Sequence, residues 1–401
     1  MSRTLARGID RMIGSGRGSR DGLIHHMVRR ARLAFPALPC ALALVLSGAT
    51  GLAEAVPATP TGTTNPRNAT SAIAPASAKT LALLAGLNGA AKQRPYEGTF
   101  VFQRGAAVRS SRIVHVADSQ GQFQRVDSLD GEARWVIEHD DDLYTYLPGS
   151  KTVVVDRRRK GQDNFPAMLS TDSAQVLQHY ALSQDGTDRV AGVACVVLTL
   201  TPRDAYRFAY RLSVDPVTGL LIKAQTLDAQ GQVLEQVAFS QIQQTTPDKA
   251  TIQSLHAAVA AMAQGDAGTG WKVVRAPSAD VDLAKAGWSL DPGVAGFRKM
   301  LELRRPMAAR QAGAPPVPVD QAVFSDGVTA VSLFIEPVGT SDRKPGQGQS
   351  GATHLLAERH GDFWVTLIGE VPAETLRRFA DAIQFTPVAV GGAKRGTVAP
   401  G

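Results

Sequence analysis

Cysteine is scarce in this chain, with two in 401 residues. Cys40 lies in an N-terminal segment that we expect to be removed, so the mature chain keeps only Cys195 and can form no internal disulfide. The valines around Cys195 favour a buried, unreactive thiol over a nucleophile. The chain has no C-x-x-C pair, which excludes the redox and zinc sites built on that motif.

The motifs of common enzyme classes are missing too. There is no H-E-x-x-H, no P-loop, no G-x-S-x-G, and no G-x-G-x-x-G placed between a strand and a helix. His354 and His360 are six residues apart across a turn, which favours two surface residues over a metal pair. We expect no catalytic site, no metal and no cofactor. A hydrolase with an unrecognised site is the weakest alternative.

The formal charge of +7 does not predict nucleic-acid binding. Residues 1–55 hold eight Arg and three acidic residues, so the rest of the chain is nearly balanced and lacks a global basic field. We interpret two basic groups as candidate contacts for an anion or an acidic partner, against the alternative of solvated surface. These groups are Arg157, Arg158, Arg159 and Lys160 in one run, and Arg304 and Arg305 in a pair.

Residues 1–55 are organised like a secretory signal. A basic stretch at 27–32 precedes a mostly apolar run at 37–49, and Ala53 and Ala55 fit the small-x-small cleavage rule. We predict cleavage before Val56, with Met27 as an alternative start. The apolar run is too short to cross a bilayer comfortably, which favours a cleaved signal over a retained anchor.

Composition and turn signals divide the remaining chain. We predict, in order, a disordered lead-in at 56–77, a large domain at 78–245, a helix and interdomain linker at 246–270, a small domain at 271–387, and a disordered tail at 388–401.

In the large domain, the sequence predicts one helix and about ten short strands. Leucine spacing indicates a helix over 78–92 that Pro95 ends, and period-two patterns separated by polar turns follow. A short helix is expected at 173–180, with strands resuming at 189–200. So large a sheet must curl. We therefore expect an α+β fold, with a curved antiparallel sheet or half-barrel wrapped around helices and an apolar concavity.

Aromatic residues are the candidates for lining that concavity, with ordinary core packing as the alternative. They are Phe100, Phe102, Trp135, Tyr144, Tyr146, Phe208 and Tyr210. The strand predicted at 206–214 places Phe208 and Tyr210 on one face and the polar Arg207 on the other.

In the small domain, the sequence predicts α+β structure as well. A hairpin at 323–335, strands at 353–359 and 363–369, and a helix after Pro372 are indicated, with a flexible, Gly-rich loop at 338–350.

Four segments resemble one protein family. They are Leu-Leu-Ala-Gly-Leu at 83–87, Tyr-Glu-Gly-Thr-Phe-Val-Phe at 96–102, the run from Tyr206 through Asp215-Pro-Val-Thr-Gly to Leu221, and Val-Thr-Leu-Ile-Gly-Glu-Val-Pro at 365–372. Together with Phe-Ser-Asp-Gly-Val at 324–328, they resemble, in the same order, the RseB/MucB family of periplasmic sigma-factor regulators. The likeness covers nearly all of 78–387.

The resemblance implies both a fold and a function. The large domain would be similar to periplasmic lipoprotein carriers. The protein would bind the periplasmic segment of a single-span anti-sigma factor in a Gram-negative bacterium and shield it from proteolysis. It would thereby regulate the envelope-stress sigma factor negatively, with lipid or lipopolysaccharide as the releasing signal. A periplasmic lipid or lipoprotein carrier is the alternative, and a homo-oligomer stays open. The predicted hinge lies near 245–271.

Overall fold

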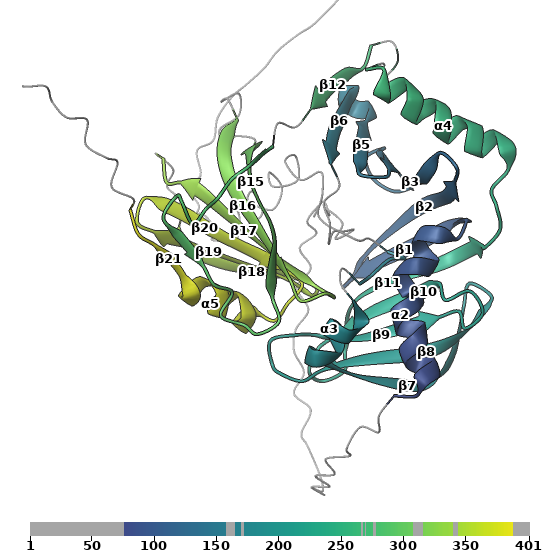
Figure 1. The fold of residues 1–401 in the computed structure, drawn as a ribbon, viewed down its shortest axis with the longest axis horizontal. Coiled ribbons are helices and arrows are strands. Elements are labelled where there is room, and N and C mark those ends of the chain that lie inside the picture. Colours follow the sequence, from purple (N-terminus) through teal and green to yellow (C-terminus); the bar gives the residue numbers. More distant parts are fainter. Residues whose placement is uncertain are drawn as a thin grey trace, which may run out of the picture.

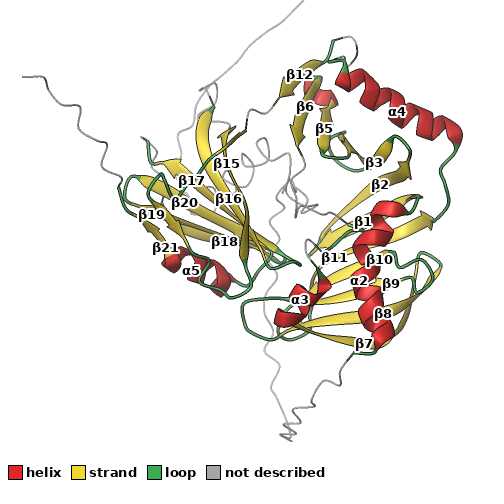
Figure 2. Ribbon diagram, viewed as in Figure 1, coloured by secondary structure: helices red, strands yellow, loops and turns green. Residues whose placement is uncertain are grey.

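The computed structural model describes residues 76–157, 165–169, 172–265, 268, 270–275, 278–307, 316–339 and 344–387. These form two sheet-based domains that lie side by side (Figure 1), with few helices among many strands (Figure 2). The predicted signal, most of the lead-in and the tail fall outside the described residues, as do Arg158, Arg159 and Lys160. Among the described helices, none is both long and apolar enough to cross a membrane.

The large domain is built on one twelve-stranded sheet in the order β12-β6-β5-β4-β3-β2-β1-β11-β10-β9-β8-β7. All neighbouring strands are antiparallel except β12, which runs parallel to β6. The strands are β1 Tyr96–Arg104, β2 Ala107–Asp118, β3 Gly121–Ser128, β4 Trp135–His139, β5 Asp142–Leu147, β6 Thr152–Arg157, β7 Tyr180–Val190, β8 Val193–Pro202, β9 Ala209–Val214, β10 Leu221–Leu227, β11 Val233–Gln243 and β12 Lys272–Arg275. A 3-10 turn at Pro148–Ser150 joins β5 to β6.

One face of this sheet carries the helix α2 (Ala78–Gln93). The helix begins where the Ser77 hydroxyl accepts from Thr80 N at 3.2 Å, which satisfies an otherwise unpaired donor of the first turn. Its Leu84 and Leu87 are fully buried and pack in one cluster with Ile113 of β2. Burying each such leucine contributes about 1.5–3 kcal/mol.

The opposite face carries the helix α4 (Lys249–Ala263), capped by the Asp248 carboxylate. Its Leu255 packs on Val114 and Val116 of β2. Side chains alternate across a strand, so Val114 and Ile113 point to opposite faces. The two long helices therefore cover different faces of the sheet, rather than both lying within one concavity.

The structure differs from the sequence prediction at β7. The chain already forms a strand from Tyr180, whereas the sequence pattern predicted that the next strand begins only at residue 189. The strand has no alternation of apolar and polar residues over Ser183-Gln-Asp-Gly-Thr-Asp188. This run is polar because most of its side chains are exposed at the edge of the sheet. A tight turn with Ala191 at φ 50° and Gly192 at φ 82° then leads into β8.

The small domain is a seven-stranded sheet in the order β13-β15-β16-β17-β20-β19-β18, with α5 (Ala373–Ala382) on one face. Its strands are β13 Ala279–Asp280, β15 Arg298–Met307, β16 Val317–Ser325, β17 Ala330–Pro337, β18 Gly346–Ser350, β19 Thr353–His360 and β20 Phe363–Gly369; β14 Trp288–Leu290 pairs separately with β21 Ile383–Phe385. Residues 346–350 thus form a strand inside the segment predicted as a flexible loop. Phe379 of α5 anchors the core against Phe297 and Phe324.

The segment predicted as linker lies mostly on the large domain. α4 packs against β2 to β4, and β12 adds a strand beside β6. The chain passes from one sheet to the other between β12 and β13. The short helix α3 (Ser173–His179) forms within the range 173–180 where the pattern predicted a helix. The predicted α+β class, with a large antiparallel sheet and a smaller second domain, is confirmed.

Candidate functional site

The predicted aromatic set does not form one cleft. Phe100 and Tyr210 belong to the cluster beneath α2, where the Phe165 ring lies 5.6 Å from Phe100 and 5.1 Å from Phe239. Phe165 comes from the segment that follows β6, outside the sheet itself. The chain therefore fills the apolar space between α2 and the sheet with its own residues 165–169.

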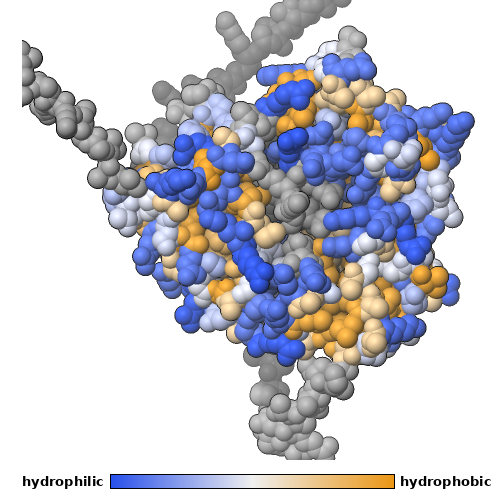
Figure 3. All heavy atoms as spheres, viewed as in Figure 1, coloured by the Kyte–Doolittle hydropathy of each residue, from blue (hydrophilic) through white to orange (hydrophobic). Residues whose placement is uncertain are grey.

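Asn88 of α2 holds this segment in place. Its Oδ1 accepts from Met168 N at 3.2 Å and from Leu169 N at 3.0 Å, and its Nδ2 donates to the Leu169 carbonyl. One side chain thus satisfies three main-chain groups that have no strand partner. Figure 3 shows apolar residues gathered on the visible face over α2, where Leu81 is 39% exposed.

Trp135, Tyr144 and Tyr146 lie on the other face, beneath α4. Trp135 stacks on Tyr146 at 5.0 Å between ring centroids, and Trp271 closes the group edge-on. Burial is the main cause that raises the pKa of both tyrosines. This second apolar group is separated from the first by the sheet.

The remaining two aromatics lie near the small domain. Phe208 stacks on His354 of β19 with ring centroids 6.2 Å apart. The Arg104 guanidinium lies 5.2 Å from the centre of the Phe102 ring. The seven residues are therefore divided among the cluster beneath α2, the cluster beneath α4 and the domain contact. Their role in ligand binding stays a prediction.

The described basic candidates differ in how exposed their side chains are and in how closely they are paired with carboxylates. The Arg157 side chain is 81% exposed and lies 3.9 Å from Asp142. Arg304 makes a two-point contact with Asp320, at 2.6 and 2.9 Å. Arg305 is nearly buried, and its guanidinium lies 3.7 Å from Asp156 of β6, so it bridges the two domains. Among these three, Arg157 is the side chain most open to an external anion.

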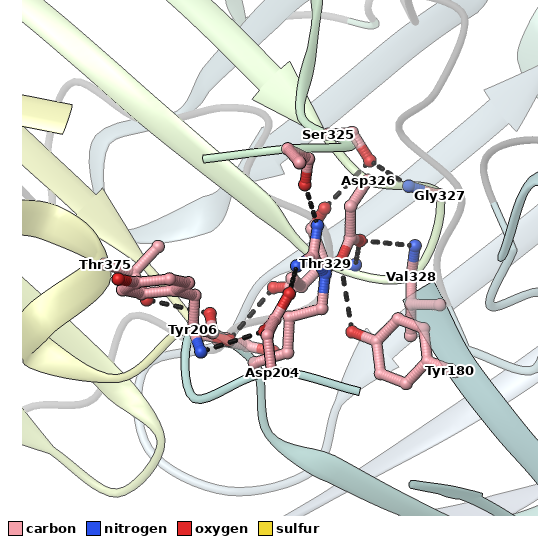
Figure 4. A network of polar contacts seen from close by, with 12 residues as sticks. Tyr180, Asp204, Tyr206, Ser325, Asp326, Gly327, Val328, Thr329 and Thr375 are labelled. Atoms are coloured by element: carbon pink, nitrogen blue, oxygen red, sulfur yellow. Dashed lines mark hydrogen bonds and ion pairs between the residues drawn. The ribbon is translucent and has the colours of Figure 1, made fainter. Parts of the chain in front are cut away.

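A fully buried ion pair joins the domains. Arg207, which precedes β9, donates from Nε to the Asp326 carboxylate at 2.7 Å, and both side chains have no exposed surface. The Tyr180 hydroxyl donates to the same Asp326 oxygen at 3.1 Å. Arg207 also contacts the Asp204 carboxylate and the Ala295 carbonyl. Figure 4 shows this network converging on the turn that carries Asp326.

The turn of the small domain is shaped to present that carboxylate. The other Asp326 oxygen accepts from Val328 N at 2.9 Å and from Thr329 N at 3.0 Å. A buried charge is tolerated only when it is paired and its remaining lone pairs are satisfied. The contact therefore depends on both the segment before β9 that carries Arg207 and the hairpin between β16 and β17.

A second polar contact lies beside the first. Arg104 pairs with Glu235 at 2.7 Å, and Glu235 accepts from Ala352 N of the small domain at 2.8 Å. Gly351 approaches so closely that a Cβ there would lie 2.5 Å from Glu235 Oε1. Burial first, and then the Glu235 charge, raise the pKa of Glu370 to about 7, while Arg104 opposes the shift.

The sequence also led to the expectation of an unreactive Cys195 and of no metal pair among the histidines. Among the described residues, no group of three or more His, Cys, Asp and Glu side chains could hold a metal. Cys195 is buried, as the sequence predicted, and burial raises the pKa of its thiol to about 11, far from that of a reactive thiolate. Sequence reasoning missed the Arg207–Asp326 pair. The only signals were an arginine in an apolar strand pattern and an Asp-Gly turn.

These features define a class of protein with two β-rich domains fastened by buried polar contacts. Models of the MucB/RseB N-terminal domain and C-terminal domain match residues 79–259 and 282–384. The chain belongs to the MucB/RseB family, as the sequence resemblance implied.

Its relatives are named as regulators. The chain is 30% identical over 300 residues to the sigma factor AlgU regulatory protein MucB of Pseudomonas aeruginosa, covering 73% of this chain and 87% of that protein. It is 23% identical over 313 residues to the sigma-E factor regulatory protein RseB of Escherichia coli K12, covering 76% and 90%.

Solved structures agree with this assignment. The crystal structure of MucB in complex with MucA(peri) has a TM-score of 0.58 and 26% identity, covering 77% of this chain and all of that chain. The Pseudomonas aeruginosa MucA/MucB complex has a TM-score of 0.59 and 27% identity, covering 78% and 100%.

Proposed function

We propose that this chain is a periplasmic negative regulator of an envelope-stress sigma factor. It binds the periplasmic segment of a single-span membrane anti-sigma factor and shields that segment from proteolysis. Lipid or lipopolysaccharide releases it. The observation that carries the proposal is the match of both domains, over the full length of the MucB chains, to structures that contain MucA.

Export supports the same proposal. Residues 1–55 have the basic, apolar and small-residue regions of a secretory signal, with cleavage before Val56. The mature protein acts without catalysis or a cofactor, by binding alone.

Release by lipid follows from linkage between two ligands. A lipid that binds the free form more tightly than the complex must weaken partner binding by the same factor. The apolar space beneath α2 is the candidate lipid site, because a mobile acyl chain can replace residues 165–169 there. In the sequence, only the four residues 161–164 separate the basic run that begins at Arg157 from this segment. Displacing 165–169 would therefore also move the candidate partner contacts.

The binding test uses the mature chain from Val56 and the periplasmic segment of the anti-sigma factor from the same organism. Calorimetry should show a one-to-one complex that lipopolysaccharide weakens, and the bound segment should resist the protease that cleaves it when free. If the unmodified chain shows no binding at micromolar concentrations, the proposal is wrong.

A periplasmic lipid or lipoprotein carrier is the second candidate function. The apolar surface over α2 and the cluster beneath it favour this alternative. A carrier transfers its cargo to an acceptor, whereas a sensor only binds it. Transfer of a fluorescent acyl chain from this protein to acceptor vesicles, together with no binding to the anti-sigma segment, would favour the carrier.

A further inference from the structure

The tip of the hairpin between β16 and β17, residues 325–329, reaches from the small domain into the large one. Val328 at this tip packs against the apolar cluster beneath α2, whose own residues all belong to the large domain. Tyr180 of that cluster donates to one oxygen of Asp326, and Val328 N donates to the other. Val328 therefore lies at the Tyr180 end of the cluster, next to the Asp326 carboxylate (Figure 4).

The hairpin tip holds its shape through its own hydrogen bonds. The Ser325 hydroxyl donates to the Thr329 carbonyl at 2.8 Å and accepts from Gly327 N at 3.0 Å. Asp326 accepts from the Val328 and Thr329 N–H groups. The φ of Gly327 is 101°, in the region that favours glycine. The hairpin tip thus presents a carboxylate and an apolar side chain, two residues apart, in a fixed arrangement.

The large domain holds a complementary place for these two groups. The Asp326 carboxylate lies 2.7 Å from Arg207 Nε and 3.1 Å from the Tyr180 hydroxyl. The Arg207 and Asp326 side chains have no exposed surface, so this charge-assisted contact is made away from water. Val328 covers apolar residues beside it. The large domain thus receives one anion and one apolar group at the same place.

Arg207 holds this anion in addition to its pairing with Asp204. The three contacts of the guanidinium use different nitrogen atoms: Nε donates to Asp326, one terminal nitrogen to Asp204 and the other to the Ala295 carbonyl. Asp326 and Ala295 belong to the small domain, whereas Asp204 belongs to the large one. When the domains part, two guanidinium nitrogens and the Tyr180 hydroxyl therefore lose their acceptors, although Asp204 stays.

We propose that the large domain has a binding site for an anionic amphiphile, such as a fatty acid, and that the hairpin tip occupies this site when the domains are in contact. The anionic group of the ligand takes the place of Asp326 on Arg207 and Tyr180. Its hydrocarbon chain takes the place of Val328 on the cluster beneath α2. The inference rests on the proposed function and deepens it, by naming the chemistry of the releasing lipid and the contact that the lipid breaks.

The two groups of the hairpin tip favour this ligand over simpler ones. A neutral lipid leaves the Arg207 and Tyr180 donors without the acceptor that Asp326 supplied, which is unfavourable in a buried place. A small anion without a chain leaves the apolar residues that Val328 covered in contact with water. Only a ligand that carries both groups replaces both contacts of the hairpin tip.

The test measures binding of radiolabelled dodecanoate, dodecanol and acetate to the mature chain by equilibrium dialysis. Dodecanoate should bind about tenfold more tightly than dodecanol, because hydrogen bonds between charged groups are stronger than those to a neutral hydroxyl. Acetate, which has no chain, should bind far more weakly than either. Dodecanoate should also speed hydrogen exchange of the Ala352 amide, which donates to Glu235 across the domain contact.

Two substitutions separate the two parts of the site. Arg207→Met removes the cation, so the preference for dodecanoate over dodecanol should disappear. Arg211→Met makes the same change at a side chain of β9 that contacts Gln225, and should keep the preference. Val328→Ala weakens the competing hairpin tip, so dodecanoate should bind about threefold more tightly. Val217→Ala, at an 86% exposed side chain, should bind like the unmodified chain.

The outcomes separate this inference from the proposed function. Equal binding of dodecanoate and dodecanol by the unmodified chain, or an unchanged preference in Arg207→Met, overturns the inference. Tight binding of dodecanoate that leaves Ala352 exchange unchanged also overturns it, because the ligand then lies outside the place of the hairpin tip. If no lipid binds while the unmodified chain still binds the anti-sigma segment, the inference is wrong and the regulatory part of the proposed function stands. Binding of dodecanoate as expected, without binding of the segment, overturns the proposed function but not the ligand site.

Discussion

Replacing Asp326 by asparagine should uncouple the two domains. The Asp326 carboxylate is the fully buried counter-charge of Arg207 and the acceptor for the Tyr180 hydroxyl. Asparagine keeps the size of the side chain and an oxygen that can hold the turn through Val328 and Thr329 N–H groups. The substitution therefore removes charge while leaving the local fold intact.

The free energy that Asp326→Asn removes from the domain contact depends on the partners that Arg207 keeps. Removing one member of a buried ion pair costs about 3–5 kcal/mol. Arg207 still contacts Asp204 and the Ala295 carbonyl, so we expect the lower end, about 3 kcal/mol, lost from the domain contact. Asp204→Asn, at a carboxylate that is 31% exposed, is the matched control and should cost about 1 kcal/mol or less.

Chemical unfolding followed by two probes measures this effect. The unmodified chain should unfold with coincident changes in tryptophan fluorescence and circular dichroism, and Asp326→Asn should separate them into two steps. Combining Arg207→Met with Asp326→Asn should recover part of the loss, because no unpaired buried charge then remains and the asparagine oxygen still accepts from the Val328 and Thr329 N–H groups. Coincident transitions in Asp326→Asn, at an unchanged midpoint, would refute the reasoning.

Three further predictions concern single residues. Because burial raises the pKa of Glu370 from 4.5 to about 7, the folded form holds this proton more tightly. Stability should therefore fall as pH rises from about 4.5 to 7, and Glu370→Gln should flatten that part of the curve. Asn88→Ala should release residues 165–169, seen as faster proteolysis there and stronger uptake of a fluorescent acyl chain, whereas unchanged proteolysis would contradict the anchoring role. Gly351→Ala should lower the thermal midpoint more than Gly361→Ala, since both have φ 58° but only the first would place a Cβ against the other domain.

Much of the fold was predictable because local chemistry marks its boundaries. Pro95 ends the first helix within one residue of the predicted position, and Asp-Gly and Gly-containing turns separate the strands as expected. The exposed strand β7 was missed, since an edge strand with polar side chains on both faces carries no period-two signal. The strand β18 was missed for the same reason.

The arrangement of the candidate site was less predictable. Alternation shows that Phe100 and Phe102 share a face, but not which helix covers it, so the separation of Trp135 from Phe100 by the sheet was not foreseen. Arg207 was expected on a polar face. Its partner Asp326 lies 119 residues away, and no local pattern connects them.

The parallel pairing of β12 with β6 leaves a very short tether between the domains. Arg275 ends β12 and Ala279 begins β13, so the four-residue step between them spans at most about 14 Å. So short a connection keeps each domain at a high effective concentration near the other. Contacts between the two domains that break therefore re-form far sooner than contacts between separate molecules. A ligand that opens the Arg207–Asp326 contact must therefore stay bound to keep it open. The protein would return to its closed form as soon as that ligand departs.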